Sequence, residues 1–122
     1  DLVDIKDQVN DIIWDQLDPD RFDFYETNAY SATALRTLGT KKYHVIIDDG
    51  SHKKDDILFV ARNYYPLLAN KGVLIIQSLQ DPKYAQELTS LFTPEQQDGI
   101  RVFDLRDTTS RYDDLVWAII KE

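Results

Sequence analysis

Residues 43–52, Tyr-His-Val-Ile-Ile-Asp-Asp-Gly-Ser-His, are the stretch that decides the fold of this chain. Its apolar run predicts a strand over residues 43–49 that is buried on both faces, as in a parallel sheet. The run ends in two carboxylates, a glycine, a hydroxyl and an imidazole. Because ligands of open α/β sheets bind just beyond the carboxyl ends of the strands, Asp48, Asp49 and His52 are candidate functional residues.

Strand and helix patterns alternate on both sides of this stretch. The expected strands cover residues 2–5, 22–26, 43–49, 72–79, 100–106 and 114–120, and the expected helices cover 7–17, 30–38, 53–65 and 82–92. Such alternation indicates an α/β fold with a mostly parallel sheet and helices on both faces. No helix is expected between the last two strands, so we predict that they pair as an antiparallel hairpin at the edge of the sheet, which is parallel except for one edge strand.

The acidic stretch resembles the fourth-strand motif of class I S-adenosylmethionine-dependent methyltransferases, in the subgroup with Asp-Asp-Gly-Ser/Pro-His. Other segments resemble the same family in matching order. They are its second strand (2–5), its third strand and adenine loop (22–30), a helix (65–68), a glycine turn (70–72), its fifth strand (73–76) and its closing hairpin (102–106 and 111–116). The resemblance implies a Rossmann-like methyltransferase sheet and makes residues 1–122 a single domain without the family's first strand and glycine-rich loop. Since the chain has no methionine and begins at Asp1, we expect it to be a piece of a longer protein.

The composition of the 122 residues narrows the possible classes of protein. A hydrophobic content of 43% is typical of a globular domain. The net charge of −8 argues against a nucleic-acid partner, which needs clustered Lys and Arg. The absence of cysteine excludes disulfides and thiol nucleophiles and fits a reducing compartment, so we expect a cytoplasmic protein. No apolar run approaches the roughly 20 residues of a membrane span, so no membrane association is expected.

The family resemblance implies S-adenosylmethionine as the cofactor and assigns residues to it. Asp4, at the end of an expected strand, is the implied acceptor for the ribose hydroxyls, although an exposed carboxylate would look the same. Asn28 and Ala29 lie in the loop implied to flank the adenine, although asparagine is also common in ordinary turns. Asp48 belongs to the acidic region that the resemblance places beside the methionine end of the cofactor.

Asp49 and His52 are the candidate catalytic residues. Adjacent strand residues point to opposite faces, so Asp48 and Asp49 cannot both point into a cleft unless the strand has already ended, and Asp49 is nearer its tip. His52 is the candidate general base for a substrate hydroxyl, because imidazole transfers protons near neutral pH. The alternative is structural: Ser51 would cap the next helix, and His52 would be a solvent-facing residue of its first turn.

Gln77 and Ser78 depart from the family pattern, which usually has Glu-Asp after the fifth strand. Because a hard cation such as Mg²⁺ prefers charged oxygen ligands, we expect no tightly bound metal. The expected function is methyl transfer from S-adenosylmethionine to an oxygen of a small molecule or saccharide. The alternative is a non-catalytic methyltransferase-like module for partner binding or assembly, which the altered motif and the lack of a glycine-rich loop favour.

Overall fold

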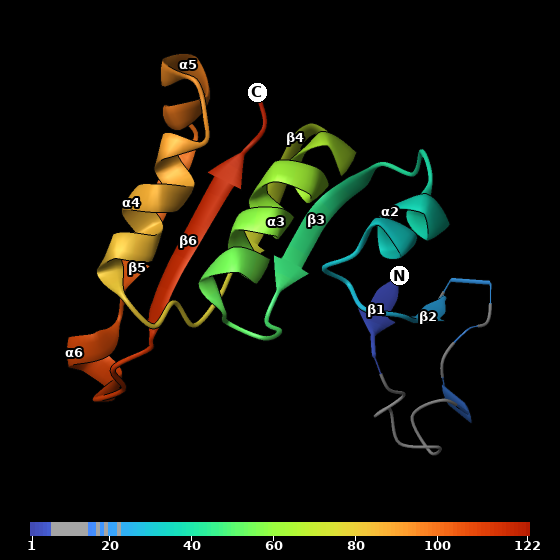
Figure 1. Ribbon diagram of the computed structural model, residues 1–122, viewed down its shortest axis with the longest axis horizontal. Helices are drawn as coiled ribbons and strands as arrows, with labels where there is room; N and C mark the ends of the chain where they lie inside the picture. Colours follow the sequence, from blue (N-terminus) through green and yellow to red (C-terminus); the bar gives the residue numbers. More distant parts are fainter. Residues whose placement is uncertain (6–14, 17, 19, 22) are drawn as a thin grey trace. The chain divides into compact units, whose positions relative to one another are not determined.

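The computed structural model describes residues 1–5, 15–16, 18, 20–21 and 23–122. The chain divides into two compact units, Asp1–Gly39 and Thr40–Glu122. Figure 1 shows that strands and helices follow one another along the chain in both units. The expected helix over residues 7–17 lies largely outside the described residues.

A two-stranded parallel sheet forms part of the first unit. Strand β1 (Leu2–Asp4) pairs with β2 (Phe24–Glu26), and both strands end at the same edge. Helix α2 (Ala32–Leu38) follows, and the Ser31 hydroxyl caps it by accepting a hydrogen bond from the backbone N–H of Ala34 at 3.2 Å. These elements confirm the strands and the helix that the sequence predicts here, with shorter ends.

The second unit contains a four-stranded sheet and the helices that connect its strands. In chain order its elements are β3 (Tyr43–Asp48), α3 (Lys54–Tyr64), the 3₁₀ helix η1 (Tyr65–Leu67), β4 (Leu68–Ile76), α4 (Pro82–Ser90), α5 (Pro94–Gln97), β5 (Ile100–Asp104), α6 (Arg106–Thr109) and β6 (Leu115–Ile120). The strand order is β3-β4-β6-β5, with β3 parallel to β4 and β6 antiparallel to both of its neighbours. A mixed α/β architecture and the antiparallel pairing of the last two strands are thus confirmed.

The antiparallel strand β6 lies between β4 and β5, and not at the edge of the sheet as the sequence suggests. The expectation of no helix between β5 and β6 is wrong, since the short helix α6 lies in their connection. The connection is nevertheless too short for a crossover, so these strands pair as a hairpin. The backbone N–H of Leu105 donates to the carbonyl of Asp114 at 2.9 Å and closes this hairpin. Strand β5 therefore takes the outer position at this end of the described sheet.

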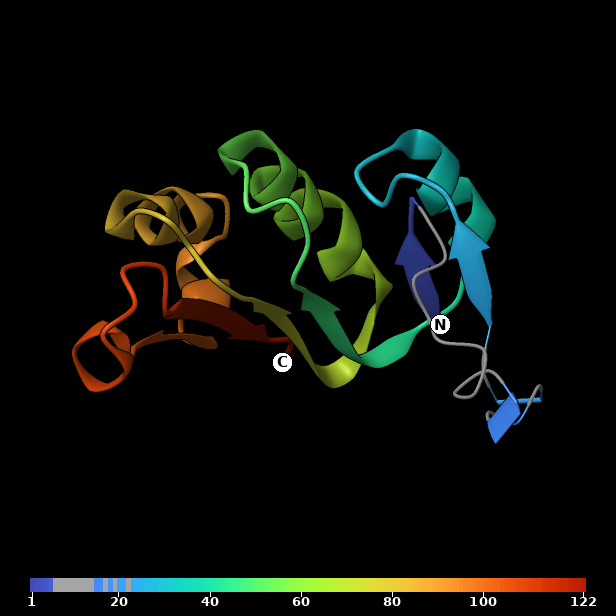
Figure 2. The ribbon, with the colours of Figure 1, turned by 90° about the horizontal axis from the view of Figure 1, so that it is seen from below.

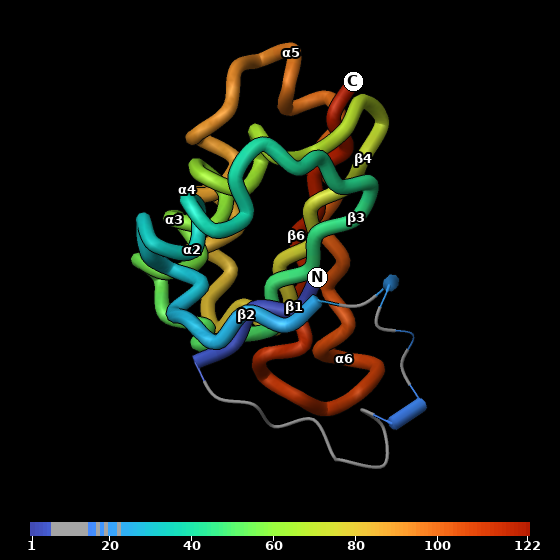
Figure 3. The backbone as a smooth tube through the Cα atoms, turned by 90° about the vertical axis from the view of Figure 1, so that its right-hand side faces the viewer, coloured from blue at the N-terminus to red at the C-terminus, as the bar shows by residue number. Residues whose placement is uncertain are grey.

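Helices α3 and α4 cover one face of the four-stranded sheet, as Figures 2 and 3 show. Ile57 of α3, Leu88 of α4 and Trp117 of β6 are almost completely buried there. Burying a large apolar side chain stabilises a fold by about 1.5–3 kcal/mol. The indole N–H of Trp117 donates to the hydroxyl of Thr89 at 3.2 Å, so the polar atom of this buried ring is satisfied.

The opposite face of the sheet is more open than the sequence predicts. Val45 and Ile47 of β3 are 53% and 58% exposed. Their register partners in β4, Val73 and Ile75, lie on the same face and are only partly buried. The expectation of a strand buried on both faces is therefore wrong for β3, and so is the expectation of helices on both faces of this sheet, because α3 and α4 pack against the same face (Figure 2).

Strand β4 begins at Leu68, before the expected strand over residues 72–79, because the predicted glycine turn is a bulge within the strand. The pairing with β3 shifts register at this bulge, and Lys71 has a φ of +64°. A Cβ atom on Gly72 would lie 2.9 Å from the carbonyl oxygen of Tyr43, so only glycine fits this close approach. The sequence predicts a turn at Gly72, but the structure has a bulge at this position.

Candidate functional site

The candidate site residues of the first unit lie at the carboxyl end of its parallel strand pair. Asp4 is the last residue of β1, and its Oδ1 atom accepts a hydrogen bond from the backbone N–H of Ile5 at 2.7 Å. The backbone N–H of Thr27 donates to the carbonyl of Asp4 at 2.8 Å. The structure therefore brings the end of β1 next to the loop that begins with Asn28.

The loop after β2 presents groups that could contact a nucleoside. The exposed Asn28 accepts a hydrogen bond from the backbone N–H of Tyr30 at 2.9 Å through Oδ1, and the Ser31 hydroxyl donates to the carbonyl of Asn28 at 2.6 Å. Ala29 follows in the turn and is partly buried. The carboxylate of Asp4 can accept from sugar hydroxyls and the amide of Asn28 can donate, so these donor and acceptor types fit a nucleoside.

In the second unit, the two adjacent acids at the end of β3 occupy different environments. Asp48 is the last strand residue and pairs in register with the buried Ile76. Burial of the phenol and, second, the negative charge of Asp48 raise the pKa of Tyr64 from 10.0 to about 12. Asp49 lies beyond the strand, and its side chain is 62% exposed. The charge of Asp48 thus affects a residue of the helix that covers the sheet, whereas Asp49 lies in the loop after the strand.

His52 lies in this loop before helix α3 and has an unusual backbone conformation. Its φ of +62° is left-handed, which costs a residue other than glycine about 1–2 kcal/mol. Its side chain is 27% exposed, and Nε2 lies 4.0 Å from Oδ1 of Asp49. Residues held in such conformations are common at functional sites, where the surrounding contacts maintain them.

The structural alternative for Ser51 and His52 does not describe the geometry found. Helix α3 begins at Lys54, its cap residue is Lys53, and no side chain of that residue caps the helix. His52 therefore precedes the helix and is not part of its first turn. The hydroxyl of Ser51 instead donates a hydrogen bond to the carboxylate of Asp56, a residue that no motif of the sequence marks.

The loop after β4 lies beside the loop after β3. The backbone N–H of Gln77 donates to the carbonyl of Asp48 at 3.0 Å, and Ser78 has a left-handed φ of +59°. The two neighbouring parallel strands thus both continue into loops with a strained polar residue. Within the described ranges of the chain, no three His, Asp or Glu side chains are grouped so that they could hold a metal ion.

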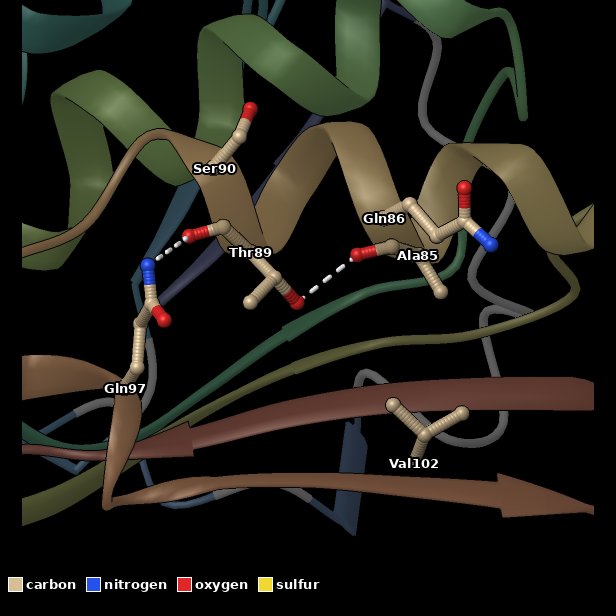
Figure 4. A pocket seen from close by; sticks show the side chains of 6 residues that line it. All are labelled: Ala85, Gln86, Thr89, Ser90, Gln97 and Val102. Carbon is tan, nitrogen blue, oxygen red and sulfur yellow. Dashed lines mark hydrogen bonds between the residues drawn. The ribbon is translucent and has the colours of Figure 1, made fainter. Parts of the chain in front are cut away.

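A shallow hollow occurs elsewhere in the second unit, between α4, α5 and β5 (Figure 4). Its lining residues are Ala85, Gln86, Thr89, Ser90, Gln97 and Val102. The hydroxyl of Thr89 donates to the carbonyl of Ala85 at 2.8 Å, and the side-chain amide of Gln97 donates to the carbonyl of Thr89 at 3.2 Å. These polar groups stabilise the helix and its connection to α5, and none of the predicted site residues lines the hollow.

The predicted site residues thus form two groups. The first unit brings Asp4 next to the loop of Asn28 and Ala29, and the second brings together Asp48, Asp49 and His52 in the loop after β3.

No helix in the described ranges has both the length and the apolar character of a membrane span. In comparisons with known proteins, no family model matches the chain and no curated protein is significantly similar to it.

Proposed function

We propose that this chain carries the cofactor and acceptor residues of an enzyme that transfers a methyl group from S-adenosylmethionine to an oxygen of a small molecule or saccharide. One observation carries the proposal: in each unit an aspartate ends a parallel strand, Asp4 in β1 and Asp48 in β3, and Asp49 directly follows Asp48. Strand-end carboxylates are where an open α/β sheet contacts a nucleotide-like ligand. The antiparallel β5–β6 hairpin adds support, because the resembled methyltransferases also close their sheet with a hairpin.

For the cofactor, we assign the carboxylate of Asp4 to the ribose hydroxyls and the loop of Asn28 and Ala29 to the adenine. Asp48 is assigned to the methionine end. The exposed Asn28 and the partly exposed Asp4 are accessible to a ligand. The cofactor supplies a methyl group on a positively charged sulfur, which leaves as the neutral thioether of S-adenosylhomocysteine.

For the reaction, we assign the general base to His52. The acceptor hydroxyl forms the new carbon–oxygen bond while its proton passes to the imidazole of His52 and the carbon–sulfur electron pair remains on sulfur. Asp49, 4.0 Å from Nε2, is close enough to stabilise the imidazolium that results. Most of the rate enhancement would come from holding the hydroxyl and the methyl group in line, with the base assisting.

A non-catalytic role in partner binding is the second candidate, and Gln77 and Ser78 favour it. They stand beside the Asp48 carbonyl, where the resembled enzymes usually have two carboxylates. Such a module would have the same sheet but would not catalyse methyl transfer. The two candidates differ in one measurable property, because only the enzyme converts S-adenosylmethionine to S-adenosylhomocysteine when an acceptor is present.

Calorimetric titration with S-adenosylmethionine and S-adenosylhomocysteine tests the proposal. The protein that contains residues 1–122 is titrated with each compound, and both compounds are expected to bind. Release of S-adenosylhomocysteine is then followed across a panel of hydroxylated small molecules and sugars. Failure of the protein to bind either nucleoside would reject the proposal, while binding without turnover on any acceptor would favour the non-catalytic module.

A further inference from the structure

We infer that Asp56 is a positioning residue for His52 and acts through the hydroxyl of Ser51. The inference rests on the proposed function, in which His52 accepts the proton of the acceptor hydroxyl. In this arrangement Asp56 touches neither the acceptor nor the cofactor. Asp56 instead fixes the position of the His52 imidazole.

The first support is a chain of two hydrogen bonds around His52. The Ser51 hydroxyl donates to the carboxylate of Asp56, and the backbone N–H of Lys53 donates to the Ser51 hydroxyl at 3.3 Å. His52 lies between Ser51 and Lys53, the two residues that the second of these bonds joins. A carboxylate that accepts from a hydroxyl makes a strong, directional bond, so the hydroxyl can hold the Lys53 amide in a fixed place.

The second support is an anchor on the other side of the same loop. The Oδ1 atom of Asp48 accepts a hydrogen bond from the backbone N–H of Gly50 at 3.2 Å. The loop is therefore tied to the end of β3 before His52 and to the first turn of α3 after it. A left-handed histidine persists only when its surroundings determine its conformation, and these two ties are the restraints that do so.

Asp55 provides a matched comparison for Asp56. Both aspartates lie in the first turn of α3, where a negative charge is favourable beside the helix N-terminus. Asp55 is exposed, whereas Asp56 is partly buried and holds Ser51. Replacing each with alanine removes the same charge from the same turn, and only Asp56→Ala removes the hydrogen bond to the loop.

The first measurement is amide hydrogen exchange by NMR on the whole chain. We expect exchange of the Lys53 amide to rise at least about tenfold in Ser51→Ala, which removes the acceptor of that amide, and in Asp56→Ala, which removes the carboxylate that holds the acceptor in place. Asp55→Ala should stay within about twofold of the original chain. In the double variant Ser51→Ala/Asp56→Ala, the Lys53 amide should exchange no faster than in either single variant, because both changes interrupt the same connection between the loop and α3.

The second measurement separates positioning from general damage. In the enzyme with an active acceptor, Asp56→Ala should lower kcat by roughly ten- to a hundredfold and leave the KM for S-adenosylmethionine within about twofold. Equal exchange rates in Asp56→Ala and Asp55→Ala would overturn the inference, as would a parallel loss of cofactor affinity and kcat. Failure of the proposed function would give another result, because neither the original protein nor any variant would bind the cofactor. The exchange rates would still show whether Asp56 holds the loop.

Discussion

The backbone N–H of Gln77 donates a hydrogen bond to the carbonyl of Asp48 at 3.0 Å, so the loops after β3 and β4 begin side by side. This bond extends the parallel pairing by one residue beyond the last register pair, Asp48 and Ile76. Left-handed residues follow in both loops, His52 in one and Ser78 in the other. This edge of the second unit is therefore where the proposed chemistry can be tested residue by residue.

His52→Ala should lower turnover by roughly 10²–10⁴ with little change in S-adenosylmethionine affinity, because it removes the proposed general base. Turnover is measured as S-adenosylhomocysteine released with an active acceptor, and affinity by calorimetry. The chain contains one other histidine, His44, which is exposed within β3 and serves as the matched control. A loss of only a few-fold in His52→Ala, or an equal loss in His44→Ala, would remove His52 from the catalytic role.

Asp4→Ala should weaken the binding of S-adenosylmethionine by about 1.5–3 kcal/mol, which is roughly a ten- to hundredfold change in Kd. The reason is the loss of a charged acceptor for the ribose hydroxyls. Asp20→Ala is the control, because it removes an exposed carboxylate from the same unit. Calorimetry gives both affinities. Equal affinity in Asp4→Ala and Asp20→Ala would exclude Asp4 from the binding site.

Ionisation of Tyr64 should lower the free energy of unfolding as the pH rises above 10. Its pKa in the folded protein is about 12 against 10.0 for an unperturbed tyrosine, so the unfolded chain loses the phenolic proton first. The stabilisation is complete below pH 10 and is lost as the pH rises to about 12, with a magnitude on the order of 2 kcal/mol. Urea unfolding at several pH values measures this effect.

Two variants test the cause of the Tyr64 shift. Tyr64→Phe should remove this part of the pH dependence, since no ionisable group remains at the position. Asp48→Asn should lower the pKa of Tyr64 by part of the shift, because burial is the larger cause and the charge of Asp48 the smaller one. An unchanged alkaline unfolding profile in Tyr64→Phe would show that another group controls it.

Much of the fold could be predicted from local sequence patterns. The apolar run of residues 43–48 and the glycine after Lys71 mark strand and backbone features that the structure contains. The bulge at Gly72 and the exposed face at Val45 and Ile47 could not be predicted, because both depend on which strand or helix packs against the segment. Apolar composition alone does not show how many faces of a strand are covered.

The candidate site shows a similar limit. The acids and the imidazole after β3 are visible as a motif, and strand-end position is enough to single them out. The hydrogen bond from Ser51 to Asp56 is not visible, because Asp55 and Asp56 are equivalent in sequence and only helix rotation distinguishes them. The coupling of Asp48 to Tyr64 likewise depends on tertiary packing across 16 positions of sequence.

Divalent cations are often used by the methyltransferases that this acidic motif resembles. Here Gln77 and Ser78 provide neutral groups beside the Asp48 carbonyl, so a cation would meet little negative charge from this loop. Because Mg²⁺ loses its water shell reluctantly, we expect no calorimetric binding of Mg²⁺ at micromolar affinity and no loss of methyl transfer on chelation. The double variant Gln77→Glu/Ser78→Asp is the positive comparison, since it returns two carboxylates and should bind Mg²⁺ more tightly. An octahedral cation joining Asp49 and Gln77 at about 2.0–2.1 Å in the unaltered protein would contradict this prediction and establish a metal-dependent mechanism.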